Sequence, residues 1–314
     1  MKKLLMLAGA ASLATLPLST QEAKTYPAPG EIVAAAKAEE WVAIAPSDLL
    51  IMDLAPDSKG NPSTGSGRRV VIQLMPAPFS QDWVGNIRKL AAARFWDGTS
   101  INRVQDNYVV QWGDATEKKA LPDNIVKVSE ANYVYPRTLP RSRTLDPLFV
   151  PPNDISRWTS FHRGFPVAGV GTPDSERNWL THCYGMVGVG RNLSPDTGTG
   201  AELYTVIGHA PRHLDRNIAL VGRVIEGIEH LSSLPRGTGA LGFYEKEEER
   251  VPIVSVRLGN EAKDAPLFEY LSTESQSFAA YADARANRRD PFFIKPAGGV
   301  DICNIHVPVR RKGK

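Results

Sequence analysis

Short runs of leucine, β-branched and aromatic residues recur along this chain, and turn-forming residues separate them. The runs occupy residues 48–55, 68–75, 99–113, 185–191, 203–207, 217–226 and 251–258. Runs of this length between glycine, proline and asparagine turns are typical of short antiparallel strands. Few segments have helical spacing, so the sequence predicts a mainly β fold, as a barrel or a sandwich. The first two runs flank a Gly/Ser/Asn/Pro cluster and predict a hairpin.

Apolar residues at helical spacing predict helices at residues 31–41, 80–95, 226–234 and 272–289. In the last segment, Thr273 and Gln276 have the spacing of a capping box. Phe278, Tyr281 and Ala282 fall on one face of that helix. We expect this face to pack against the barrel, and a partner-binding face is the alternative. A last strand-like run covers residues 300–309.

Residues 115–182 interrupt the strand pattern. They are rich in proline, arginine, aspartate and serine and predict an insertion of loops with short pieces of structure. The predicted organisation is therefore a main domain at residues 45–260, with the insertion at about 115–182. A C-terminal extension at residues 261–314 is expected to pack on this domain.

The first 23 residues have the pattern of a secretory signal peptide: two lysines, an apolar run, then small or polar residues. The apolar run is too short for a good membrane span, so we expect a periplasmic or secreted protein without stable membrane insertion. Cleavage after Ala14 or within residues 20–23 remains open, and an uncleaved signal acting as an anchor is the alternative. The net charge of +3 on 314 residues does not indicate a nucleic-acid partner.

The chain has two cysteines, Cys183 and Cys303, which lie 120 residues apart. Two cysteines in an exported protein favour one disulfide, and two buried thiols are the alternative. In the chain-entropy account, closing a loop of this length contributes about 4–5 kcal/mol as an upper value.

Several common kinds of catalytic site are absent from the sequence. It contains no zinc-ligand spacing, no Gly-x-Ser-x-Gly motif and no phosphate-binding loop. His209 and His213 are four residues apart, but Pro211 between them argues against a helical metal site. We therefore expect no metal and no bound cofactor. An enzyme with this sequence would act by binding and polarising its substrate.

The order of the motifs resembles that of the cyclophilin-type peptidyl-prolyl cis-trans isomerases. The first block consists of Phe-Trp-Asp-Gly (95–98), Ile-Asn-Arg (101–103), Tyr108 and Gln-Trp-Gly-Asp (111–114). Later blocks follow at residues 185–191, 200–205 and 214–227. The similarity covers residues 48–114 and 183–258 and leaves out the insertion and the extension. It implies a closed eight-stranded antiparallel barrel capped by two helices.

The resemblance also assigns roles to individual residues. It implies that Arg103, Gln111 and Tyr108 are catalytic, with Arg103 hydrogen-bonding to the twisted prolyl amide. It implies that a second group binds the substrate: Val109, Gly190, Tyr204, His213 and Leu214. The implied partners are proline-containing segments of unfolded or exported proteins.

At some positions the chain differs from the family pattern. Glu202 stands where a glutamine is common, His213 where many members have tryptophan, and Ile218 where many have histidine. The predicted function is peptidyl-prolyl isomerisation of exported proteins. The alternative is a catalytically weak binding or chaperone module on the same fold.

Overall fold

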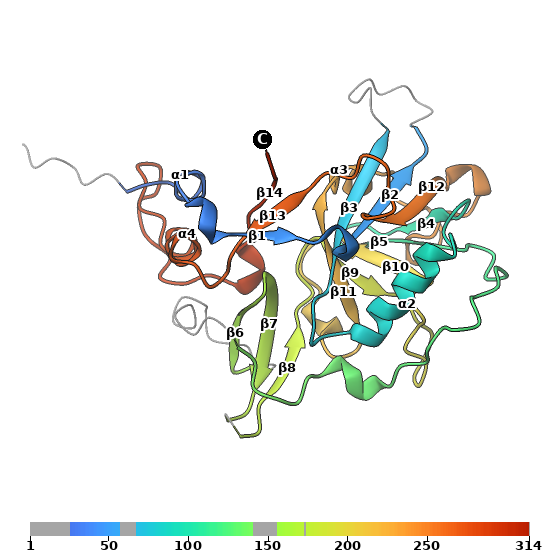
Figure 1. The fold of residues 1–314 in the computed structure, drawn as a ribbon, viewed down its shortest axis with the longest axis horizontal. Helices are drawn as coiled ribbons and strands as arrows, with labels where there is room; N and C mark the ends of the chain where they lie inside the picture. Colours follow the sequence, from blue (N-terminus) through green and yellow to red (C-terminus); the bar gives the residue numbers. More distant parts are fainter. Residues whose placement is uncertain (1–25, 57–66, 141–155, 173, 314) are drawn as a thin grey trace, which may run out of the picture.

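Eight strands close into one antiparallel barrel in the computed structural model, which describes residues 26–56, 67–140, 156–172 and 174–313 (Figure 1). Around the barrel the order is β10 (Leu203–Val206), β5 (Val109–Gly113), β4 (Ser100–Val104), β12 (Val251–Leu258), β2 (Leu49–Leu54), β3 (Arg68–Leu74), β11 (Leu220–Glu226) and β9 (Met186–Val189). Strand β9 pairs with β10, which closes the sheet. The prediction of a mainly β fold with a closed eight-stranded barrel is confirmed. The predicted signal peptide lies outside the described residues.

Strand β2 shows how the barrel is covered on both sides. Leu50, Met52 and Leu54 belong to the main core, whereas Leu49 and Ile51 pack in a second cluster with residues of the extension. Successive side chains of a strand point to opposite faces, so both faces of β2 are buried. The predicted hairpin is present, since β2 pairs with β3 from Leu49 to Leu54. Its connecting residues, 57–66, lie outside the described part of the chain.

Two helices pack on the barrel, and both are shorter than predicted. Helix α2 (Gln81–Ala92) buries Trp83, Ile87 and Leu90 completely. It ends where Arg94 takes a left-handed conformation, with φ of 54°. Helix α3 (Glu229–Ser232) starts later than predicted because β11 continues to Glu226. Gly227 follows with φ of 82°, and the chain turns there between the strand and the helix.

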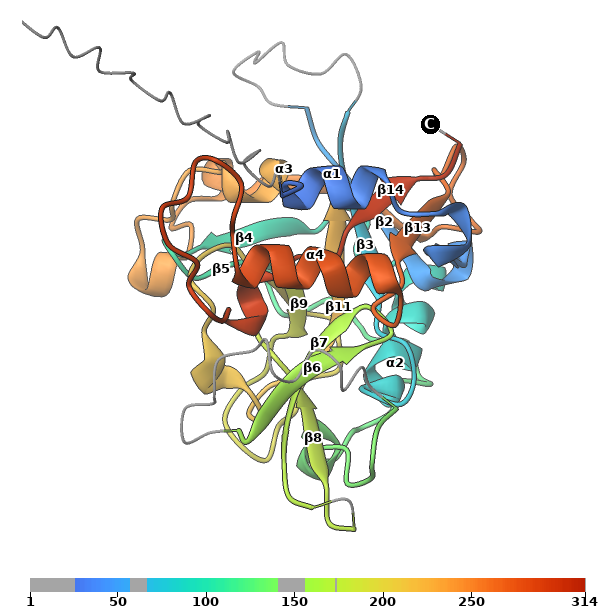
Figure 2. The same cartoon turned by 90° about the vertical axis from the view of Figure 1, so that its left-hand side faces the viewer.

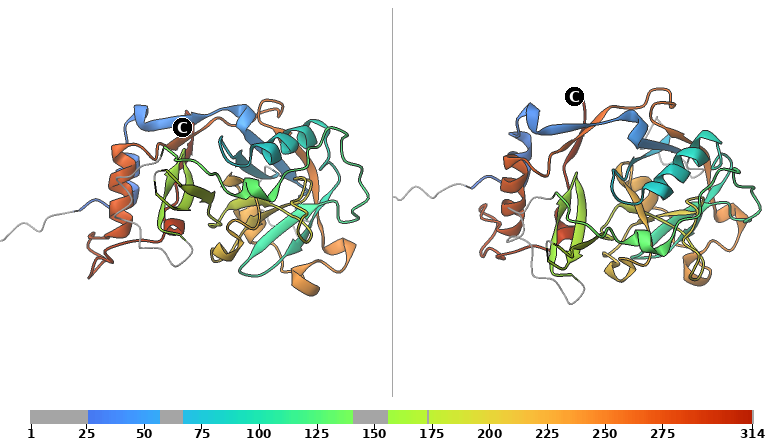
Figure 3. Two further views of the ribbon diagram at one scale, coloured as in Figure 1. Left: turned by 90° about the horizontal axis from the view of Figure 1, so that it is seen from below. Right: turned by 60° about the horizontal axis from the view of Figure 1, so that its bottom comes forward.

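The insertion contains the short pieces of structure that its composition allowed. Three strands form a separate antiparallel sheet: β6 (Trp158–His162), β7 (Phe165–Val170) and β8 (Arg177–Leu180). Figure 3 shows this sheet between the barrel and the helix of the extension. On its far side, Phe161 of β6 meets Phe278 of that helix edge to face, with ring centroids 5.2 Å apart.

The extension forms a sheet and a helix together with the N-terminal part of the chain. Strand β13 (Phe268–Leu271) lies between β1 (Trp41–Ile44) and β14 (Val309–Arg311). Helix α4 (Gln276–Ala286) lies beside α1 (Pro29–Ala34) (Figure 2). The face formed by Phe278, Tyr281 and Ala282 is buried.

Three local predictions in these terminal regions are wrong. The first helix ends at Ala34, because the chain becomes extended again at Trp41 to pair with β13. The N-cap of α4 is Ser275, whose side chain accepts from the Phe278 amide, and not a Thr273–Gln276 capping box. Residues 302–304 form a 3₁₀ turn, so the last strand begins only at Val309.

Arg223 of β11 joins the barrel, the insertion and the extension. Its Nε and Nη2 donate to Gln73 Oε1 at 3.0 and 2.8 Å, and its Nη1 donates to the Gly164 carbonyl at 2.7 Å. The guanidinium also lies against the rings of Phe165 and Tyr270, at 4.8 and 5.7 Å from their centroids. Burial lowers the pKa of Arg223 to about 10. One buried side chain therefore contacts all three parts of the fold.

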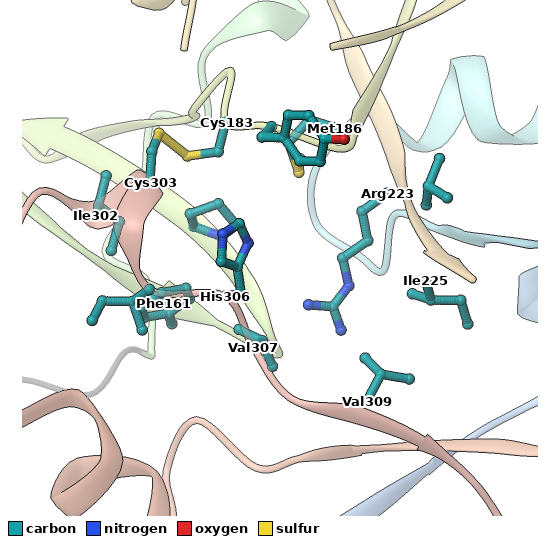
Figure 4. Close-up of a pocket in the computed structure, with 14 residues that line it drawn as sticks. Phe161, Cys183, Met186, Arg223, Ile225, Ile302, Cys303, His306, Val307 and Val309 are labelled. Carbon is teal, nitrogen blue, oxygen red and sulfur yellow. A yellow bond between two sulfur atoms is a disulfide. The ribbon is translucent and has the colours of Figure 1, made fainter. Parts of the chain in front are cut away.

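The expected disulfide between Cys183 and Cys303 is present, with an S–S distance of 2.06 Å. It borders a cavity of about 220 Å³ that Arg223 and His306 also line (Figure 4). The disulfide ties the extension to the barrel at a second point, next to the Arg223 contacts.

We expect the R223K substitution to lower the free energy of unfolding by about 2–4 kcal/mol. Lysine keeps the charge but cannot donate to Gln73 and to the Gly164 carbonyl at the same time. Each buried acceptor left without a donor costs about 1–3 kcal/mol of stability. Denaturant unfolding measures the change. The control is R289A, which removes an exposed ion pair to Asp283 and is expected to cost less than about 1 kcal/mol. Equal losses in both variants would contradict this role of Arg223.

Candidate functional site

Arg103 projects from β4 at the wall of a large cavity. It lies directly opposite Gln111 of β5 in the antiparallel register, next to an irregularity between Ile101 and Arg103. Its Nη1 donates to Gln111 Oε1 at 3.1 Å, and its Nε donates to the Leu241 carbonyl at 2.8 Å. Its Nη2 also donates to Gln105 Oε1. Acceptors from three segments thus fix the plane of the guanidinium.

Two aromatic rings flank the same guanidinium. Its carbon lies 5.9 Å from the centroid of Tyr108 and 5.3 Å from that of Phe243. Burial lowers the pKa of Arg103 from its usual value. Arginine nevertheless stays protonated in proteins. The site therefore presents a permanent, partly desolvated cation whose orientation is fixed.

An apolar surface lies beside Arg103. Val109, Tyr204 and Val206 form a small buried cluster, and Tyr108 and Ile218 pack against it. These side chains come from the neighbouring strands β5 and β10, from Tyr108 just before β5, and from Ile218 just before β11. Such a surface can hold a small apolar ring and exclude water from it.

The polar and apolar parts share one cavity of about 620 Å³. The sequence-predicted residues in its wall are Arg103, Tyr108, Val109, Gln111, Gly190, Tyr204 and Leu214. His213 is not among the lining residues. Its ring stacks on Tyr108, with centroids 6.2 Å apart and planes 12° from parallel. Most of the predicted site residues are thus brought together, with the exposed His213 stacked on one of them.

Glu202, the glutamate at a position where glutamine is common, lines this cavity. Its Oε2 accepts from Gln111 Nε2 at 3.5 Å, and the Asn102 side chain also hydrogen-bonds to it. Burial raises the pKa of this carboxyl to about 7. The carboxyl rests on Gly113, where an added Cβ would lie 1.9 Å from Glu202 Oε1. The substitution of glutamine by glutamate therefore places a group that titrates near neutral pH beside the partner of Arg103.

The sequence did not predict one side of the site. Leu241 and Phe243, in and next to a 3₁₀ turn at Ala240–Gly242, reach Arg103 from 138 and 140 residues along the chain. No motif marks this turn. Its only signal is a short apolar and aromatic stretch, residues 240–244, between a glycine-rich segment and a charged one.

The described residues hold no group of three or more His, Cys, Asp or Glu side chains that could bind a metal ion. No helix in the same part of the chain is long and apolar enough to cross a membrane.

Comparison with known proteins identifies the family. The family model for cyclophilin type peptidyl-prolyl cis-trans isomerase/CLD matches residues 63–258. The chain therefore belongs to the cyclophilin-type peptidyl-prolyl cis-trans isomerases, and it is an enzyme of that class. No curated protein sequence matches it significantly.

One solved structure agrees with this chain on the fold. Cyclophilin AquaCyp293 from Hirschia baltica has a TM-score of 0.63 and 20% sequence identity, covering 86% of this chain and 92% of its own. A Cryptosporidium parvum cyclophilin type peptidyl-prolyl cis-trans isomerase, in the presence of dipeptide ala-pro, has a TM-score of 0.38 and 10% identity. That match covers 67% of this chain and 98% of the other. The first match covers more of this chain than the barrel alone.

The carboxyl of Glu202 makes the stability of this protein depend on pH. The pKa of this carboxyl is about 7 in the folded protein and 4.5 in an unfolded chain. Between these pH values the folded protein therefore holds a proton that the unfolded chain releases. The free energy of unfolding therefore falls as the pH rises through that window. We expect E202Q to match the wild type near pH 4.5 and to exceed it in stability at pH 8.

Denaturant unfolding at several pH values measures this difference. E248Q, at an exposed glutamate, is the control and should follow the wild type throughout. A difference between E202Q and wild type that stays constant from pH 4.5 to 8 would refute the raised pKa.

Proposed function

We propose that this isomerase acts on X–Pro bonds of exported proteins, and that the guanidinium of Arg103 acts on the prolyl amide. The observation that carries the proposal is the placement of a fixed guanidinium and an apolar surface in one cavity. Such a pair suits a substrate with an apolar ring next to a polar amide.

The chemistry requires no nucleophile and no proton transfer. Amide resonance gives rotation about the bond a barrier of about 18–20 kcal/mol. In the twisted transition state, the prolyl nitrogen loses conjugation and gains an available lone pair. A donor aimed at that nitrogen binds the transition state more tightly than the planar ground state and so accelerates rotation.

The contacts of Arg103 suit it to this role. Its Nε and one N–H of Nη1 are engaged by Leu241 and Gln111, so the side chain need not be ordered when the substrate binds. A pre-oriented donor costs no reorganisation at the moment of reaction. Gln111 orients the guanidinium from the opposite strand and can also contact the peptide backbone.

The apolar surface supplies the seat for the proline ring. Val109 and Tyr204 form its floor, and Leu214 and Tyr108 stand at its sides. Gly190 lies close to Gln111 Nε2, since a Cβ built on it would be 3.6 Å from that atom. Its lack of a side chain leaves space for a peptide backbone to pass.

The proposal that the substrates are exported proteins rests on the N-terminal pattern of residues 1–23 and on the disulfide. Disulfides persist mainly in oxidising compartments such as the periplasm. Unfolded exported chains in that compartment contain X–Pro bonds whose slow isomerisation limits folding. We therefore propose a periplasmic or secreted location, which compartment fractionation with a periplasmic marker would test.

We expect R103A to lower kcat/KM for proline peptides by about 10²–10³-fold, because it removes the donor to the twisted amide. R103K should lose most of the activity as well, since lysine cannot make the several hydrogen bonds that orient the guanidinium. Protease-coupled assays and NMR exchange on several X–Pro peptides measure the rates. R289A, which removes an arginine of the extension, is the matched control and should keep wild-type kinetics.

The R103A result decides between the proposed function and its alternative, and the R103K result tests how Arg103 acts. Equal rates in wild type and R103A, with both proteins folded, would favour a binding or chaperone module on the cyclophilin fold. Full activity of R103K would mean that a positive charge suffices without the fixed orientation.

A further inference from the structure

A network of buried, hydrogen-bonded polar side chains extends from Tyr204 away from the cavity. The Tyr204 hydroxyl lies 2.8 Å from His182 Nε2, and His182 Nδ1 lies 2.9 Å from Asp215 Oδ1. Arg212 Nε donates to Asp215 Oδ2 at 2.6 Å. The side chains of His182 and Asp215 have no exposed surface at all. None of the motifs in the sequence predicted this arrangement.

The surroundings fix the direction of each hydrogen bond. Asp215 Oδ1 also accepts from the backbone amide of His182 at 2.9 Å, and Arg212 balances its charge. Burial lowers the pKa of His182, so its ring is neutral, and the Asp215 carboxylate selects the tautomer with the proton on Nδ1. His182 Nε2 is then an acceptor, and the Tyr204 hydroxyl donates to it. Burial also raises the pKa of Tyr204 well above its usual value, so the hydroxyl keeps its proton.

The strand next to Tyr204 leaves room for this hydroxyl. Tyr204 pairs with Gly188 of β9, and a Cβ at Gly188 would lie 2.3 Å from both Cζ and Oη of Tyr204. A larger residue at position 188 would push the phenol away from His182. Glycine at this position and tyrosine on β10 thus form a matched pair.

At its other end, the network of side chains contacts the turn that forms one side of the proline site. Arg212 and Asp215 flank the turn that carries Leu214, a residue of the cavity wall. Through His182, the same carboxylate is therefore linked to the floor at Tyr204 and to this turn. The seat has two walls from distant parts of the sequence, and one buried network connects them.

We propose that His182 and Asp215 are positioning residues for the isomerase, which hold Tyr204 and the Leu214 turn in the arrangement that receives the proline ring. This inference rests on the proposed function of the cavity. The network touches neither Arg103 nor the prolyl amide, so its effect falls on substrate binding and not on the twisting step. Loss of the network should raise KM while leaving kcat nearly unchanged.

Three variants test the network from both ends. Y204F removes only the hydroxyl and keeps the ring, and H182L removes the acceptor. H182Q can still donate to Asp215 and accept from Tyr204. We expect KM for a proline peptide to rise about three- to tenfold in Y204F and H182L, the loss of one hydrogen bond, and H182Q to recover most of this loss. The double variant H182L/Y204F should lose no more than H182L alone, because H182L already removes the bond that Y204F removes.

The matched control is Y281F, which removes the hydroxyl of another buried tyrosine. Tyr281 donates to the His306 carbonyl at 2.8 Å in the extension, away from the cavity. Y281F should lower the melting temperature about as much as Y204F without changing KM. If H182L does not fold, the test uses Y204F and H182Q: KM should rise in Y204F and stay near the wild-type value in H182Q.

The outcomes separate this inference from the proposed function. If the wild type is active and folded Y204F and H182L have the wild-type KM, the positioning role is overturned and the proposed function stands. Additive losses in the double variant would also overturn it. An inactive wild type would instead refute the proposed function, and peptide affinities from NMR titration of the same variants would then test the network alone.

Discussion

The register of the β4–β5 hairpin is the constraint on which the site depends, because it sets Arg103 opposite Gln111. The turn between the strands is held by a bond from the Gln105 amide to the Val109 carbonyl at 2.9 Å. Asn107 takes the left-handed conformation within it and accepts from the His209 amide at 2.7 Å. Since side chains alternate between the faces of a strand, a slip of one residue would turn Arg103 away from the cavity.

The parts added to the barrel are attached around a second, smaller cavity, which Arg223 and the disulfide line. Arg223 bonds across to Gln73 and to the Gly164 carbonyl of the insertion, and the disulfide holds the extension at Cys183. Cys183 directly follows His182, whose ring reaches the floor of the cavity. The extension is therefore covalently joined to the barrel one residue from the network behind the proline seat.

The sequence predicted what local spacing and family resemblance determine. Arg103 and Gln111 are eight residues apart on one hairpin, so their proximity follows from the strand pattern. The contact of Arg103 with Leu241 spans 138 residues and has no local signal. The strands β6, β7 and β8 were not predicted one by one, because residues 115–182 are rich in turn-forming and charged residues. In β7, Pro166 also argues against a strand, although it pairs with Phe161 of β6. His182 and Asp215 were missed because a buried network depends on packing across distant segments.

The measurement that tests the central claim most directly is a crystal structure with a bound proline peptide. The account predicts the proline ring against Val109 and Tyr204, with a nitrogen of Arg103 within about 3 Å of the prolyl amide group. It also predicts that the guanidinium keeps its bonds to Gln111 and to the Leu241 carbonyl. A peptide bound outside this cavity, or an Arg103 side chain turned away from the amide, would contradict the account.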